Sequence, residues 1–249
     1  MQRLLMVLVL ITLSFLLGAC ANISREKYND ELAKVINDNN QLYKYFNKPD
    51  KDPGGKNDAN LKRILLDQEI EKAIFDYAVD NNKAWSIESI LSSGWLKIFV
   101  DKGMLLLNDE DKLYMLQEIG HSIANLPFDQ CTSFFGRNMS SIKFRTNDRF
   151  FDIKFEMTKN GAINRNKNFK APGKVKLGVA LVALIAKAKE SMTDDEMENS
   201  IRFFINFKEA NKDELCALLS KLFVLTEDIE PKYRNIIFDQ LVFLRRETL

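Results

Sequence analysis

The chain has 249 residues, of which 36 are basic, 35 are acidic and only one is a histidine. This length is enough for one sizeable domain or two small ones. Because the charges nearly balance, no global field attracts a polyanion, and nucleic-acid binding is not expected. The single histidine, His121, excludes His-rich zinc sites and the paired Glu-x-x-His motifs of di-iron bundles. We therefore predict no metal site and no cofactor.

The first twenty residues have the features of an export signal. Arg3 supplies a positive charge, an apolar run over residues 4–17 follows, and Gly18 and Ala19 precede Cys20. A charged start, an apolar centre and small residues before a cleavage site are typical of a secretory signal peptide. The run is too short to span a bilayer, which needs about 20 apolar residues. Residues 1–19 are therefore predicted to be a signal peptide.

The segment Leu17-Gly18-Ala19-Cys20 resembles the lipobox of bacterial lipoproteins. The resemblance covers residues 1–20 only, and Gly18 is a less usual occupant of its position. It implies that Cys20 receives a diacylglyceryl group on its sulfur and becomes the first residue of the mature chain. Ala21 is not the aspartate that typically retains such proteins at the inner membrane. The resemblance therefore implies a lipid-anchored protein of the outer membrane that faces the periplasm.

An apolar stripe over residues 24–46 predicts a helix that follows the anchor. Its members, spaced alternately four and three residues apart, are Tyr28, Leu32, Val35, Asn39, Leu42 and Phe46. Such spacing is typical of a coiled-coil seam. One interpretation is a membrane-proximal stalk over 20–47 that binds a partner helix. The alternative is that the stripe packs on the protein's own body. Residues 48–59, which are rich in Pro and Gly, predict a flexible linker before a domain over 60–249.

Helix start signals recur through the main body. Asp58 or Asn60 can cap a helix that runs to about Asn81, and Ser86 and Asn108 can cap the next two. A Thr-x-x-Glu capping box over residues 193–196 begins another, and a proline at position 231 suits the first turn of the last. Residues 177–186 are almost entirely apolar and predict a helix buried on all sides. The fold class predicted is mainly α, an irregular multi-helix bundle.

The segment over residues 141–157 fits two structures. Alternation of apolar and polar residues, with Asn147-Asp148 between two runs, predicts a β-hairpin. A helix that is capped by Asn147 and ends at Gly161 fits as well, since Phe151 and Phe155 are one turn apart.

No catalytic motif is recognisable in the mature chain. His121 is expected on a solvated helix face that it shares with Tyr114, Glu118 and Asn125. Cys131 and Cys216 form an even pair in a compartment that permits disulfides, so a bond between them is predicted. The alternative is two buried thiols.

The strongest charge pattern lies over residues 137–176, where eleven basic residues stand against three acidic ones and phenylalanines are interleaved. Candidate contacts to an anionic surface in this segment are Arg145, Arg149, Lys154 and Lys159. They would meet anionic lipid headgroups or an acidic protein partner. The alternative is that acidic residues between 194 and 230 neutralise the segment, while its phenylalanines lie in the core.

These features predict a membrane-anchored envelope protein with a non-catalytic binding, scaffold or inhibitor role. The alternative is an envelope enzyme whose carboxylate or cysteine site forms only in three dimensions. The sequence does not determine the partner or the oligomeric state.

Overall fold

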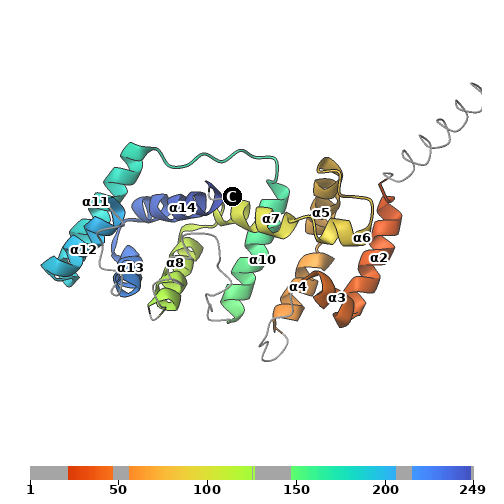
Figure 1. Ribbon diagram of the computed structural model, residues 1–249, viewed down its shortest axis with the longest axis horizontal. Helices are drawn as coiled ribbons and strands as arrows, with labels where there is room; N and C mark the ends of the chain where they lie inside the picture. The colour runs from red at the N-terminus through yellow and green to blue at the C-terminus, as the bar shows by residue number, and fades with distance from the viewer. Residues whose placement is uncertain (1–21, 47–55, 125, 127–146, 206–214, 248–249) are drawn as a thin grey trace, which may run out of the picture. The chain divides into compact units, whose positions relative to one another are not determined.

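The computed structural model describes residues 22–46, 56–124, 126, 147–205 and 215–247. Within these ranges every regular element is a helix and there is no strand (Figure 1). The prediction of a mainly α, multi-helix protein is confirmed. No helix in the described ranges is long and apolar enough to span a bilayer.

The chain divides into two compact units. Unit 1 comprises residues 1–99 and 158–165, and unit 2 comprises residues 100–157 and 166–249. The helices of unit 1 are α2 (Arg25–Asn37), α3 (Asn39–Tyr45), α4 (Lys56–Leu66), α5 (Gln68–Asp80) and α6 (Ile87–Leu91). Those of unit 2 are α8 (Asp109–Ile123), α11 (Lys174–Ser191), α12 (Asp194–Ile205), α13 (Leu215–Val224), the 3₁₀ helix η2 (Leu225–Asp228) and α14 (Pro231–Glu247). Two further helices, α7 (Trp95–Met104) and α10 (Asp148–Ile163), contribute residues to both units. This division groups residues 60–99 with the N-terminal helices, whereas the sequence predicted one domain over 60–249.

The N-terminal stripe packs inside unit 1. Ser24 caps α2 by accepting a hydrogen bond from the amide of Lys27, and the helix is interrupted at Asp38, which caps α3. Tyr28 and Leu42 are fully buried, whereas Asn39 is exposed. The alternative in which the stripe packs on the protein's own body is confirmed. A free-standing stalk with Asn39 in its seam is wrong, because a projecting stalk would leave Tyr28 in water.

The helix predicted from Asp58 or Asn60 to Asn81 is two helices. Asp67 interrupts it, because its carboxylate accepts hydrogen bonds from the amides of Glu69 (3.0 Å) and Ile70 (3.1 Å) and so caps α5. The first helix, α4, already begins at residue 56, so residues 56–59 of the predicted linker are helical. The remainder of that linker, residues 48–55, lies outside the described residues.

Local capping predictions elsewhere are confirmed. Ser86 accepts from the amide of Ser89 at 3.1 Å, and Asn108 accepts from that of Asp111 at 2.8 Å. In the capping box, the amide of Thr193 donates to the Glu196 carboxylate, and the Glu196 amide donates back to the Thr193 hydroxyl. These bonds satisfy amides that the first helical turn leaves without a backbone partner.

The open choice over residues 147–161 is decided in favour of a helix. The Asn147 side chain accepts from the amide of Phe150 at 2.8 Å and begins α10. Phe151 and Phe155, one turn apart, are both buried. The β-hairpin is therefore wrong from residue 148 onward, and residues 141–146 lie outside the described residues.

Candidate functional site

The four basic side chains predicted to contact an anionic surface are not gathered on one free surface. Arg145 lies outside the described residues. Arg149 is half-exposed, with Nη2 3.7 Å from Oδ1 of Asp111 and its guanidinium 4.7 Å from the ring centre of Tyr114. Lys154 is partly buried, and that burial lowers its pKa. Both residues belong to unit 2, where Arg149 contacts Asp111 and Tyr114 and Lys154 is partly removed from water.

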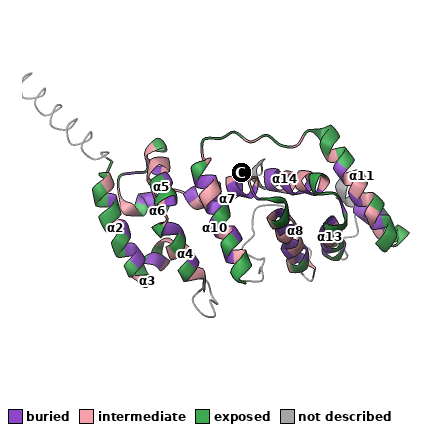
Figure 2. Cartoon of the chain, turned by 180° about the vertical axis from the view of Figure 1, so that it is seen from behind, coloured by how far each residue is buried: buried purple, intermediate pink, exposed green. Residues whose placement is uncertain are grey.

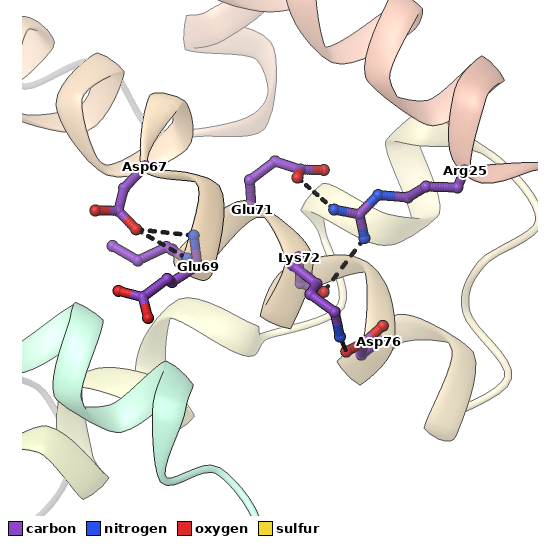
Figure 3. Close-up of polar contacts among 7 residues, drawn as sticks. Arg25, Asp67, Glu69, Glu71, Lys72 and Asp76 are labelled. Carbon is purple, nitrogen blue, oxygen red and sulfur yellow. Dashed lines mark hydrogen bonds and ion pairs between the residues drawn. The ribbon is translucent and has the colours of Figure 1, made fainter.

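Lys159 belongs to an ionic network on α5 in unit 1. Figure 3 shows the α5 side of this network, with Asp67, Glu69, Lys72 and Asp76. Its ammonium lies 2.9 Å from carboxylate oxygens of both Asp67 and Glu69. Farther along the same helix, Asp76 accepts from Arg165 at 3.1 Å and from Lys72 at 2.7 Å. Lys159 and Arg165 are thus neutralised inside the protein, which was the alternative to an anionic surface. The carboxylates that neutralise them belong to α5 and its cap, and not to residues 194–230 as predicted.

The N-terminal helix joins this network through Arg25. Its guanidinium pairs with Glu71 and also donates to the backbone carbonyl oxygen of Lys72 at 3.4 Å. Its guanidinium carbon lies 5.5 Å from the ring centre of Tyr28. Burial raises the pKa of Glu71, although Arg25 opposes that rise. The network ties α2 and α10 to α5, so its role is structural.

Protonation of Asp67 should weaken this network. Burial alone would raise the pKa of this carboxyl, but hydrogen bonds from Lys159 and from the amides of Ile70 and Glu69 outweigh burial and hold it below its usual value. A lowered folded-state pKa stabilises the protein above the unfolded pKa of about 4, and that contribution is lost as the pH falls through the folded-state value.

We expect Asp67→Asn to destabilise unit 1 at pH 6 and to make a smaller difference at pH 3. Asparagine caps a helix as well as aspartate does, so the variant removes the charge and retains the cap. Urea unfolding followed by tryptophan emission reports on unit 1, because Trp85 and Trp95 both lie in it. A difference in unfolding midpoint that stayed constant between the two pH values would contradict the ionic role of Asp67.

Other predicted site residues lie apart. Cys216 is buried in α13 and Cys131 lies outside the described residues, so their disulfide stays a prediction. His121 is exposed on the last turn of α8, as predicted, but Glu118 is buried and does not share a solvated face with it. Among the described residues, no group of three or more His, Cys, Asp or Glu side chains is arranged to hold a metal ion.

The most unusual surface of unit 2 is on α11. The prediction that residues 177–186 are buried on all sides is wrong. One face, with Ala180, Leu184 and Ala188, is buried, whereas Val175, Val179 and Val182 are 82%, 48% and 66% exposed (Figure 2). Successive spacings of four and three residues place these valines on one helix face, with exposed Ala186 as the next member. We call these four residues the valine stripe.

Lysines accompany the valine stripe. Lys174 and Lys176 are exposed in the first turn of α11, which contains no acidic residue, and exposed Lys170 precedes them. Within the described part of the chain, none of the three makes an ion pair. Positive charge at a helix N-terminus opposes the helix dipole, so local stability does not explain these lysines. The sequence does contain a sign of this surface, because apolar residues fall on two opposite faces of the helix. In a nearly continuous apolar run, however, the exposed face cannot be told from the buried one.

Fold and surface thus define an all-helical protein, over its described residues, in two compact units with an apolar, lysine-bordered helix face. Comparison of the chain with protein-family models, with curated proteins and with solved structures finds no match.

Proposed function

We propose that this chain is a lipid-anchored protein of the bacterial cell envelope that binds another envelope protein and catalyses no reaction. The lipobox-like segment that ends at Cys20 supports the anchor, and Ala21 favours the outer membrane, on its periplasmic side. The observation that carries the binding role is the valine stripe of α11. A contiguous apolar face left in water marks an interaction site more often than scattered apolar residues do.

The chemistry of the stripe favours a particular kind of partner. Its spacing suits packing against another helix, whose side chains would lie between the valines. Helices that insert into a lipid surface generally carry larger apolar residues such as Trp, Phe and Leu. The bordering lysines disfavour a second copy of this chain, because like charges would meet. The partner proposed is therefore an acidic, amphipathic helix of another protein.

Site-specific photocrosslinking in intact bacterial cells tests this proposal. A photoreactive residue at Val182 or Val179 should give the same crosslinked protein, whereas one at Asp195, an exposed residue of α12, should not. Mass spectrometry of the product should locate the crosslink on an acidic helix. Val182→Lys should reduce the yield from position 179 by about tenfold or more, since a buried charge costs well over 1.4 kcal/mol.

Three results would contradict the proposal. Equal crosslinking from position 195 would mean that the stripe is not the binding face. Crosslinks only to lipid or to a second copy of the chain would show that the stripe does not bind a helix of another protein. Absence of fatty acid on Cys20 in the same cells would remove the anchor.

A further inference from the structure

The loop between α5 and α6 presents a tryptophan to solvent. Trp85 is 54% exposed, whereas its neighbour Ala84 is fully buried. The loop is held by backbone hydrogen bonds: the amide of Asn82 donates to Val79 at 3.0 Å, and that of Lys83 to Ala78 at 2.7 Å. The backbone of Asn82 is in the left-handed region, with φ of 54°, a conformation that asparagine tolerates. Trp85 therefore projects from a fixed turn.

The same loop is bonded to the start of the described chain. The amide of Ile23 donates to the carbonyl oxygen of Ala84 at 2.7 Å, and Ser24 then caps α2. In Figure 1 the loop that leaves α5 passes beside the beginning of α2. All of these residues belong to unit 1.

Cys20 precedes Ile23 by three residues. Three residues span at most about 11 Å even when fully extended. The backbone of Cys20 is therefore within about 11 Å of Ile23, whose amide is bonded to Ala84, the residue before Trp85. An acylated Cys20 lies at the bilayer surface, because its acyl chains enter the hydrocarbon.

We infer that Trp85 docks in the interfacial layer of the bilayer that holds Cys20, so that the loop over residues 81–86 is a membrane-contacting surface. This inference rests on the lipid anchor of the proposed function. Indole has a large apolar body and one polar N–H, and it is enriched at the level of the lipid headgroups. Exposed Lys83 adds a positive charge suited to lipid phosphate. A short covalent tether makes the contact effectively intramolecular.

The chain contains its own fluorescence control. Its second tryptophan, Trp95, is fully buried against Phe99, with ring centres 5.6 Å apart. A quencher in the bilayer should therefore reach Trp85 and not Trp95. Because Trp85 is exposed, Trp85→Phe should leave the fold intact, and the emission of Trp95 verifies this.

The experiment uses the full mature protein, acylated in cells, purified and reconstituted into vesicles of phosphatidylethanolamine and phosphatidylglycerol with brominated acyl chains. We expect the emission to fall relative to unbrominated vesicles, the Trp85→Phe variant to lose no emission, and Cys20→Ser protein mixed with the same vesicles to lose none. Mass spectrometry of the reconstituted protein establishes whether Cys20 carries acyl groups.

The possible outcomes distinguish failure of membrane docking by Trp85 from failure of the lipid anchor at Cys20. Acylated protein whose emission is unaffected by bromine overturns docking by Trp85 and leaves the anchor in place. Equal quenching of the Trp85→Phe variant also overturns it, because the quenched residue would then be Trp95. Protein without acyl groups on Cys20 overturns the anchor and, with it, this inference.

Discussion

Gly161→Ala is expected to destabilise unit 1 by about 3 kcal/mol or more, in the upper range for overpacked cores. Gly161 is buried on α10, where a Cβ atom would overlap the backbone carbonyl oxygen of Phe99 on α7. A backbone atom cannot rotate away as a side-chain end can, so the two helices would have to separate. Urea unfolding followed by tryptophan emission should show a transition at much lower urea, since both tryptophans belong to unit 1.

Gly178→Ala is the matched control. Gly178 lies within α11, and a Cβ atom there would have no neighbour within 4 Å. Alanine is favoured over glycine in a helix interior by about 1 kcal/mol, so this variant should be as stable as the parent or more stable by circular dichroism. The same substitution thus has opposite signs at two helical positions. Equal effects at both would show that helix propensity decides, and that the approach of α7 to Gly161 is not tight.

Asp239→Ala is expected to destabilise unit 2 by about 3 kcal/mol, the lower end for breaking a buried ion pair. The Lys112 ammonium lies 2.7 Å from Oδ1 of Asp239, and the two side chains are 7% and 30% exposed. Burial raises the pKa of Asp239, and the hydrogen bond from Lys112 only partly offsets the rise. Removal of the Asp239 carboxylate would leave the buried Lys112 ammonium without this counter-charge.

The double variant Lys112→Met, Asp239→Leu tests whether the lost stability comes from leaving the Lys112 charge buried without its partner. Replacement of both members of a buried pair by apolar residues is often close to neutral, so most of the lost stability should return. Unfolding followed by circular dichroism measures both variants. A double variant as unstable as Asp239→Ala would mean that packing of these side chains, and not the unpaired charge, sets the cost.

Helix boundaries set by a few neighbouring residues could be predicted well from the sequence. The caps at Ser86 and Asn108 and the box from Thr193 to Glu196 depend on hydrogen bonds that span three residues. The break at Asp67 was missed, although the residue is a good cap, because the apolar pattern continues across it. The helix over 148–163 could not be separated from a hairpin, since its phenylalanines satisfy both periods.

The candidate binding surfaces depend on contacts between residues far apart in the chain. Lys159 was predicted to face an anionic surface, yet it pairs with Asp67, which lies 92 positions earlier. Val179 and Val182 of α11 lie in a run typical of a core, because an apolar residue has the same sequence signature whether or not a neighbour covers it. Nothing in the sequence around Trp85 distinguishes it, since its place beside the start of α2 follows from the bond between Ile23 and Ala84.

The sequence by itself determined that the described part of this chain is helical, where several of its helices begin, and which segment resembles a lipoprotein signal, because each depends on residues within a few positions of one another. Only the tertiary structure decided which charges are neutralised, which apolar face of α11 meets water, and which glycine lies against a neighbouring backbone. Those outcomes depend on the close packing of segments that the chain separates widely, and packing removes water from one face of a helix while leaving an equally apolar face exposed.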